Sequence, residues 1–110
     1  LRELVGVHFR GLGADVRCLV QDSVEAGRDY RGPPVSVLFI DDHHSADQLR
    51  RDLEVWLPHL APRASILMHD YPTPVYQLVV TAECMLPQAG FEYGGVLGDS
   101  IVGTWTRGCR

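Results

Sequence analysis

Two stretches of the chain are apolar at almost every position, a pattern that is typical of buried strands. Residues 35–40 read Val-Ser-Val-Leu-Phe-Ile, and residues 65–68 read Ser-Ile-Leu-Met. A strand that is apolar on both of its alternating faces belongs in the middle of a sheet that is covered on both sides. A shorter strand is predicted at residues 15–20, where apolar and charged positions mix.

Helical spacing separates these strands. Apolar residues recur at intervals of three and four over residues 1–12, and a brief helix is predicted over residues 24–30, with Asp22 or Ser23 as its N-cap. The clearest helix begins after Ser45 and carries an apolar stripe. That stripe consists of Leu49, Leu53, Trp56 and Leu60.

The ends of the helices have their own signals. Gln48 lies three positions after Ser45, which is the spacing of a capping box. Pro58 is expected to bend or end that helix, since a proline in a helix interior costs about 3 kcal/mol. A last helix is predicted from residues 73–74 to about Leu86, with Gly90 closing the turn.

The C-terminal part predicts a hairpin. Residues 91–93 and 101–106 flank Gly98 and Asp99, a turn signal, so the two flanks are expected to pair in antiparallel fashion. Helices that alternate with strands before this hairpin predict an α/β fold.

Composition narrows the class of protein. The 110 residues are 45% hydrophobic and 22% charged, as expected for one globular domain over residues 1–110. The net charge of −4 argues against a nucleic-acid partner, and no apolar stretch approaches the ~20 residues of a membrane span. Three widely spaced cysteines without a CxxC pair indicate reduced thiols and a cytoplasmic location.

Polar side chains follow all three predicted strands. They are Gln21, Asp22 and Ser23 after the first, residues 41–45 after the second, and His69, Asp70 and Tyr71 after the third. Ligands of open α/β sheets bind outside the carboxyl ends of the strands. If the strands are parallel, the three clusters meet at one edge and form a binding site for a small molecule.

Residues 37–71, VLFIDDHHSADQLRRDLEVWLPHLAPRASILMHDY, resemble class I S-adenosylmethionine-dependent methyltransferases of the small O-methyltransferase-like group. In that group a strand ending like FIDGDHS leads into a DLxxWLPLL helix, a PGG turn and a strand ending in HDY. The matching residues are Phe39, Ile40, Asp41, His44, Ser45, Asp52, Leu53, Trp56, Leu57, Pro58, Leu60, His69, Asp70 and Tyr71. The resemblance implies a partial Rossmann-like sheet, strands three to seven of the order 3-2-1-4-5-7-6, with an antiparallel C-terminal hairpin.

The resemblance also implies roles at the strand ends. S-adenosylmethionine, the implied cofactor, would be contacted by residues Gln21, Asp22, Ser23 and Asp41. In metal-dependent relatives the positions of Asp41, His69 and Asp70 hold a divalent ion such as Mg²⁺ or Mn²⁺, which would acidify a substrate hydroxyl. The alternative is that both aspartates cap the following helices and His69 packs.

Asp41 and His44 are the candidate catalytic residues. An unperturbed imidazole titrates near pH ~6.5, so His44 is a possible general base. The alternative is that His44 orients its loop through Asp41 or the backbone.

The chain also departs from the family pattern. Asp42 and His43 replace a Gly-Asp pair, and no Gly-rich E/D-x-G-x-G loop is found, because residues 11–13 continue a helical pattern. We therefore expect a fragment of a methyltransferase domain that is weak or inactive alone. Without strands one and two, residues 35–40 would expose an apolar edge, through which two copies could form a homodimer.

Three functions stay open at this point. The first is methyl transfer from S-adenosylmethionine to a hydroxyl oxygen of a small molecule or sugar. The second takes Asp42, His43 and His44 as the DHH signature of metal-dependent phosphoesterases, although no upstream D-x-D pair accompanies it. The third is a non-catalytic Rossmann-like remnant that acts as an interaction module.

Overall fold

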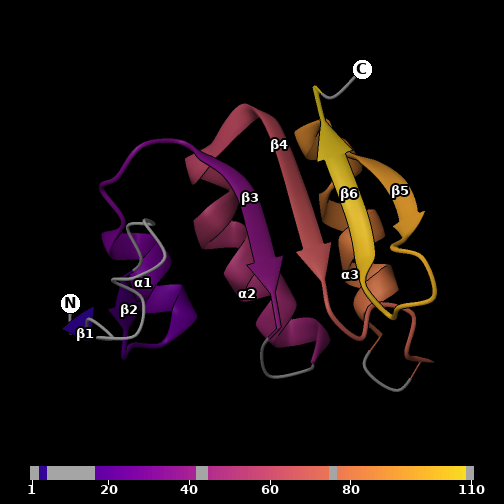
Figure 1. The fold of residues 1–110 in the computed structure, drawn as a ribbon, viewed down its shortest axis with the longest axis horizontal. Coiled ribbons are helices and arrows are strands. Elements are labelled where there is room, and N and C mark those ends of the chain that lie inside the picture. The colour runs from indigo at the N-terminus through magenta and orange to yellow at the C-terminus, as the bar shows by residue number, and fades with distance from the viewer. Residues whose placement is uncertain (1–2, 5–16, 42–44, 75–76, 109–110) are drawn as a thin grey trace.

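The computed structural model describes residues 3–4, 17–41, 45–74 and 77–108, and its main feature is a four-stranded sheet. The strands are β3 (Val35–Ile40), β4 (Leu60–Met68), β6 (Gly103–Arg107) and β5 (Glu92–Val96), in that order across the sheet (Figure 1). β3 runs parallel to β4, whereas β6 is antiparallel to both of its neighbours. The α/β class is confirmed, and the strand order agrees with strands four, five, seven and six of a partial Rossmann-like methyltransferase sheet.

The two strands nearest the N-terminus lie outside this sheet. β1 (Glu3–Leu4) and β2 (Cys18–Leu19) pair only with each other, in antiparallel fashion. The helix predicted over residues 1–12 is therefore wrong at residues 3–4, and residues 5–16 lie outside the described part of the chain. The strand predicted at residues 15–20 is present only as β2, and it is not a parallel neighbour of β3.

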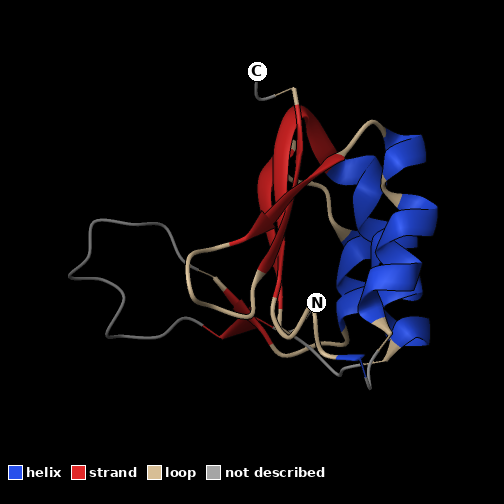
Figure 2. Cartoon of the chain, turned by 90° about the vertical axis from the view of Figure 1, so that its right-hand side faces the viewer, coloured by secondary structure: helices blue, strands red, loops and turns tan. Residues whose placement is uncertain are grey.

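Three α-helices form one layer on one side of the sheet (Figure 2), and the first of them lies beyond the edge strand β3 (Figure 1). They are α1 (Ser23–Asp29), α2 (Ala46–Trp56) and α3 (Leu78–Met85), and α2 packs between the other two. The Ser45 hydroxyl accepts a hydrogen bond from the Gln48 amide at 3.0 Å, which confirms the predicted cap of α2. Pro58 lies in the 3-10 turn η2 (Leu57–His59) that ends α2, as expected.

Two element boundaries differ from the prediction. β4 begins at Leu60 rather than at residue 65, because Leu60 already pairs with Val35 of β3, whereas β6 pairs with β4 from Ala64 onward. α3 begins at Leu78 rather than at residues 73–74, because Gln77 has a φ of 55°, which no helix can continue through. Gly90, with a φ of 89°, closes the 3-10 turn η4 (Pro87–Ala89), as predicted.

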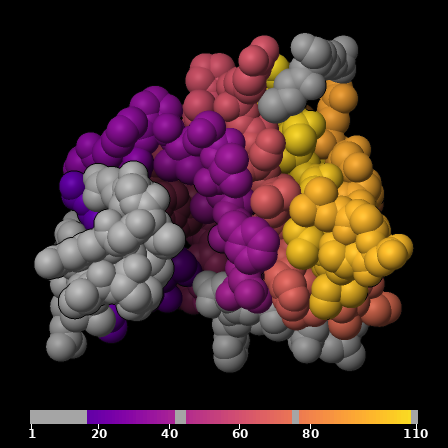
Figure 3. Space-filling view, in the orientation of Figure 1, coloured from indigo at the N-terminus to yellow at the C-terminus, as the bar shows by residue number. Residues whose placement is uncertain are grey.

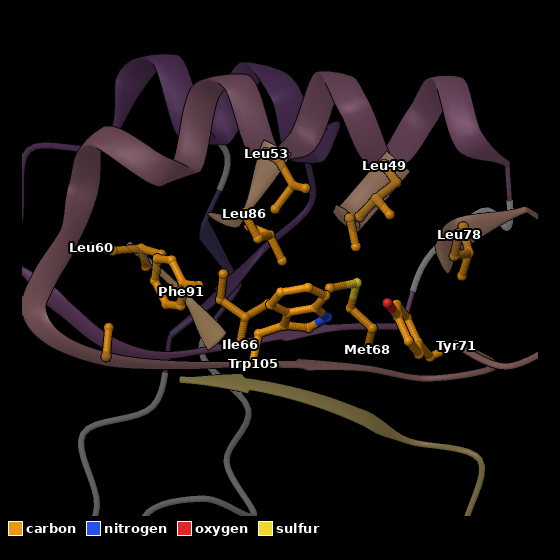
Figure 4. Packing of buried hydrophobic residues seen from close by; sticks show 12 residues of the cluster. Leu49, Leu53, Leu60, Ile66, Met68, Tyr71, Leu78, Leu86, Phe91 and Trp105 are labelled. Carbon is orange, nitrogen blue, oxygen red and sulfur yellow. The ribbon is translucent and has the colours of Figure 1, made fainter. Parts of the chain in front are cut away.

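The core lies between the helices and the covered face of the sheet (Figure 4). Its largest fully buried side chains are Leu53 of α2, Ile66 and Met68 of β4, and Leu86 after α3. Trp105 of β6 joins this cluster. No helix within the described ranges has both the length and the apolar character needed to cross a membrane, and the longest, α2, has 11 residues.

The position of β3 corrects one prediction. Within the described part of the chain, β3 pairs with β4 alone and lies at the edge of the sheet, so it is not the covered central strand that its sequence indicates. Val37 and Phe39 are 58% and 52% exposed on the face opposite the helices, which is the face turned to the viewer in Figure 3. Among the described residues, β3 therefore carries exposed apolar side chains and no strand pairs with its outer side.

Candidate functional site

The parallel register of β3 and β4 brings two polar clusters side by side. Ile40 lies opposite Met68, and the His69 amide donates a hydrogen bond to the Ile40 carbonyl at 2.9 Å. Asp41 and His69 therefore leave the sheet next to each other at its carboxyl edge. This placement agrees with the expectation that the clusters following these two strands lie at one edge of the sheet. We call the group formed by Asp41, His69 and Asp70 the rim.

His69 lies between two carboxylates. Its Nδ1 atom is 3.0 Å from Oδ2 of Asp70 and 3.4 Å from Oδ1 of Asp41. Nδ1 has almost no accessible surface, whereas the side chain as a whole is 37% exposed, so the rest of the ring faces outward. A carboxylate beside one ring nitrogen fixes the orientation of an imidazole. Asp70 reaches this position from a left-handed backbone conformation with a φ of 59°, which aspartate tolerates better than most residues.

The predicted metal ligands Asp41, His69 and Asp70 are neighbours, but their arrangement gives a metal site no support. Within the described ranges, no three His, Cys, Asp or Glu side chains are grouped so that they could hold a metal ion. Ligand atoms must converge at about 2.0–2.2 Å on one point, and Nδ1 instead faces the carboxylates. The predicted base His44 lies outside the described residues, as do Asp42 and His43.

A cavity of about 250 Å³ lies beside the free edge of β3. It is lined by Ser23 of α1, by Leu38, Phe39, Ile40 and Asp41 of β3 and its end, and by Asp52 and Trp56 of α2. Asp41 belongs to both the cavity and the rim, so Ser23, Asp41 and Asp70 lie on one side of the molecule. The cavity is smaller than the roughly 300–1,000 Å³ of most small-molecule pockets, so it would hold part of a cofactor rather than all of it.

Two other predicted cofactor contacts do not line this cavity. The Gln21 amide donates a hydrogen bond to Asp29 at 3.1 Å. Asp22 caps α1, accepting a hydrogen bond from the Glu25 amide at 3.4 Å, and lines a separate charged groove with Arg28 and other residues. Of the cluster after β2, only Ser23 shares the cavity with Asp41.

Asp52 holds the start of α1 against α2. Its Oδ1 atom accepts a hydrogen bond from the Ser23 hydroxyl at 2.5 Å and another from the Gln48 amide group at 3.2 Å. The Trp56 indole N–H donates to the Ser23 carbonyl at 2.9 Å. Gly27 permits this close contact, since a Cβ there would lie 2.5 Å from a methyl group of Val55.

Sequence reasoning gave Asp52 no function and treated Trp56 as core. The signal that could have found Asp52 is its spacing, because it lies three residues after Leu49 and beside Leu53, on the apolar stripe of α2. Asp52 is only 3% exposed. A carboxylate is rarely buried unless other groups bind it, so an aspartate on an apolar stripe indicates a polar network.

Tyr71 follows the rim cluster but belongs to the core. Tyr71 is 3% exposed, and its ring packs at a tilt against that of Tyr93, with the ring centroids 5.4 Å apart. Burial raises the pKa of Tyr71, an effect that the Trp105 side chain opposes and that the nearby Tyr93 and Glu83 reinforce. Tyr71 therefore anchors the neighbouring Asp70 to the hydrophobic core.

Comparisons with known proteins place this geometry in context. Residues 2–71 match the model of a protein family described as "Methyltransferase domain". The chain is also 30% identical over 87 residues to a protein of Sinorhizobium fredii named "Uncharacterized protein y4gI". That alignment covers 74% of this chain and 10% of the relative, so the chain spans about a tenth of the relative's length.

Proposed function

Because this chain belongs to the family of methyltransferase domains, we propose that its rim takes part in methyl transfer from S-adenosylmethionine to a hydroxyl oxygen of a small molecule or sugar. The observation that carries the proposal is that Asp41 belongs to two features of the structure at once. Asp41 lines the cavity beside β3 and also lies 3.4 Å from His69 on the rim. A group held in the cavity would thus lie next to polar atoms that can receive an acceptor molecule.

The residues of the cavity suit part of this cofactor. S-adenosylmethionine, which the family implies, supplies an electrophilic methyl group when it is bound. Leu38, Ile40 and Trp56 provide apolar walls that exclude water from one end of such a ligand, and Ser23 and Asp52 provide polar atoms there. On the rim, the Asp41 carboxylate and the outward part of the His69 ring can hold the proton that the acceptor hydroxyl loses.

Catalysis by such a site would depend mainly on position. When an acceptor oxygen is held in line with a methyl group, most of the acceleration of methyl transfer comes from this orientation. The imidazole of His69 contributes to that orientation. His44 stays a predicted catalytic residue, whereas the predicted divalent ion has no support from the described residues. The cavity is too small for a complete cofactor, so we expect weak binding and little activity from these 110 residues alone.

Calorimetric titration of the 110-residue chain with S-adenosylhomocysteine, the product form of the cofactor, tests this proposal. We expect measurable binding, and we expect Asp41→Asn to weaken it about tenfold, or roughly 1.4 kcal/mol. Asp47→Asn is the matched control, because Asp47 is an exposed aspartate on the outer side of α2. Absence of binding by the unchanged chain, or equal losses in both variants, would contradict the proposal.

A further inference from the structure

Helix α1 is attached to the rest of the molecule mainly on one side. It packs against α2, and within the described chain no strand of the four-stranded sheet makes an extended contact with it. Val24 and Ala26 are its buried apolar side chains. Neither belongs to the hydrophobic cluster between the helices and the sheet, to which α2 contributes Leu49 and Leu53. The core therefore holds α2 in place but does not hold α1 directly.

Polar and aromatic contacts join α1 to α2. The Trp56 indole N–H donates a hydrogen bond to the Ser23 carbonyl at 2.9 Å. The His59 ring donates through Nε2 to the Gly27 carbonyl at 2.5 Å. The Tyr30 ring packs against the rings of Trp56 and His59, with centroids 5.5 and 5.1 Å apart. We call these five residues the seam. A hydrogen bond contributes less to net stability than a large buried apolar side chain, so the seam should break before the core does.

The chain on both sides of α1 allows it to move as a unit. Before α1, β2 pairs with β1 and, among the described strands, with none of the four-stranded sheet. After α1, the exposed residues Gly32, Pro33 and Pro34 lead into β3. The prolines are stiff and Gly32 is free to rotate, so this link can act as a hinge. The Tyr30 hydroxyl, which donates to the Pro33 carbonyl at 2.6 Å, holds the hinge in its present position.

Ser23 connects the seam to the cavity beside β3. It is the residue that α1 contributes to the cavity lining, and Asp52 and Trp56 of α2 line the cavity as well. Ser23 is hydrogen-bonded to both of them. When the seam breaks, Ser23 leaves the cavity together with α1, and the wall formed by α2 becomes accessible.

We propose that α1 is a lid, which opens from α2 as a unit while the sheet, α2 and α3 stay folded, and which thereby gives access to the cavity beside β3. Elements that are held by few buried apolar contacts open at a lower free energy than the core of the same domain. Opening of the lid needs no bound ligand and no methyl transfer, so the inference goes beyond the proposed function.

Native-state hydrogen exchange of the 110-residue chain, followed by NMR, tests the lid. The Ala26 amide reports on α1, because it donates to the Asp22 carbonyl at 2.9 Å. The Ile66 amide reports on the core, because Ile66 is fully buried in β4 between β3 and β6. After correction for intrinsic exchange rates, we expect Ala26 to exchange at least about 100-fold faster than Ile66. Equal rates at the two amides would overturn the inference.

The two tryptophans of the chain give a matched pair of variants. Trp56→Phe keeps an aromatic ring in the seam but removes the donor to Ser23, so exchange at Ala26 should rise about fivefold with no change at Ile66. Trp105→Phe alters the core and should speed exchange at Ile66 with no change at Ala26, because α1 still opens by the local route. Trp56→Phe that speeds both amides equally, or that unfolds the whole chain, would contradict the lid.

A second seam variant and a chemical probe complete the test. His59→Phe removes the donor to Gly27 and should act as Trp56→Phe does. In a chain whose three cysteines are replaced by serine, Leu38→Cys places a thiol on the cavity wall. An aromatic disulfide reagent too large for the closed cavity should label this thiol more slowly than it labels the unfolded chain, by the protection factor of Ala26.

Trp56→Phe should raise the labelling rate and the exchange at Ala26 by the same factor. A labelling rate that this variant leaves unchanged would show that α1 does not control access, and would overturn the inference. These results would leave the lid standing even if S-adenosylhomocysteine failed to bind, an outcome that counts against the proposed function alone.

Discussion

Gly103 lies against the ring of Tyr71, and the two residues cannot both carry a side chain at this spacing. A Cβ on Gly103 would lie 2.4 Å from two ring carbons of Tyr71. The contact is held from both sides, because the Tyr71 amide donates to the Ile101 carbonyl at 3.1 Å and Gly103 pairs with Met68. The start of β6 and the turn after β4 are thus fixed to each other next to His69 and Asp70.

Gly103→Ala should therefore destabilise the protein. Overfilling a packed core costs about 1–3 kcal/mol, because the ring or the strand must move. We expect a loss of that size in the free energy of unfolding, measured by urea denaturation. Ser36→Ala on the exposed part of β3 is the control and should change this free energy by less than about 0.5 kcal/mol. Equal stabilities of the Gly103→Ala variant and the unchanged chain would contradict the packing described above.

Burial of Tyr71 predicts a decline of stability in alkaline solution. Because burial raises the pKa of Tyr71 in the folded state, the folded protein keeps the phenol proton where the unfolded chain has lost it. The contribution of Tyr71 to the free energy of unfolding is fully present below the ordinary tyrosine pKa of about 10. It falls as the pH rises toward the higher folded-state pKa. Chemical denaturation between pH 8 and about 11 should show this fall, and Tyr71→Phe should flatten it. Tyr30→Phe, at the C-terminal end of α2 against Trp56 and His59, should leave the slope unchanged, and an equal effect of both variants would rule out Tyr71 as the cause.

The exposed apolar face of β3 predicts self-association. Residues 35–40 carry no charge and no proline, the features with which edge strands ordinarily prevent pairing. We propose that two copies associate through this edge, so the apparent mass in sedimentation velocity should rise with concentration. Val37→Lys should restore the monomer, because it places a charge on the exposed edge. Val80→Lys is the matched control, since Val80 is a valine of similar exposure, 63%, on α3. A monomer at all concentrations, or equal effects of both lysines, would exclude association through β3.

Local sequence determined those features that depend on neighbouring residues. The hydroxyl of Ser45 and the amide of Gln48 are three residues apart, so their cap could be read without knowledge of the fold. The same holds for the 3-10 turn at Pro58 and the positive φ at Gly90. The apolar runs at residues 35–40 and 65–68 predicted β3 and the end of β4, because a short apolar run is the local sequence signal of a buried strand.

Tertiary structure alone decided the features that join distant residues. The sequence indicates that residues 35–40 are buried, but exposure depends on whether another strand or helix lies beside them. Of the strands that the structure describes, β4 alone pairs with β3. His69 faces Asp41 only because the register of β3 and β4 places Ile40 opposite Met68. The Ser23 hydroxyl reaches Asp52 across 29 positions of sequence. Contacts of this kind arise from packing between elements, and no local pattern of residues encodes their geometry.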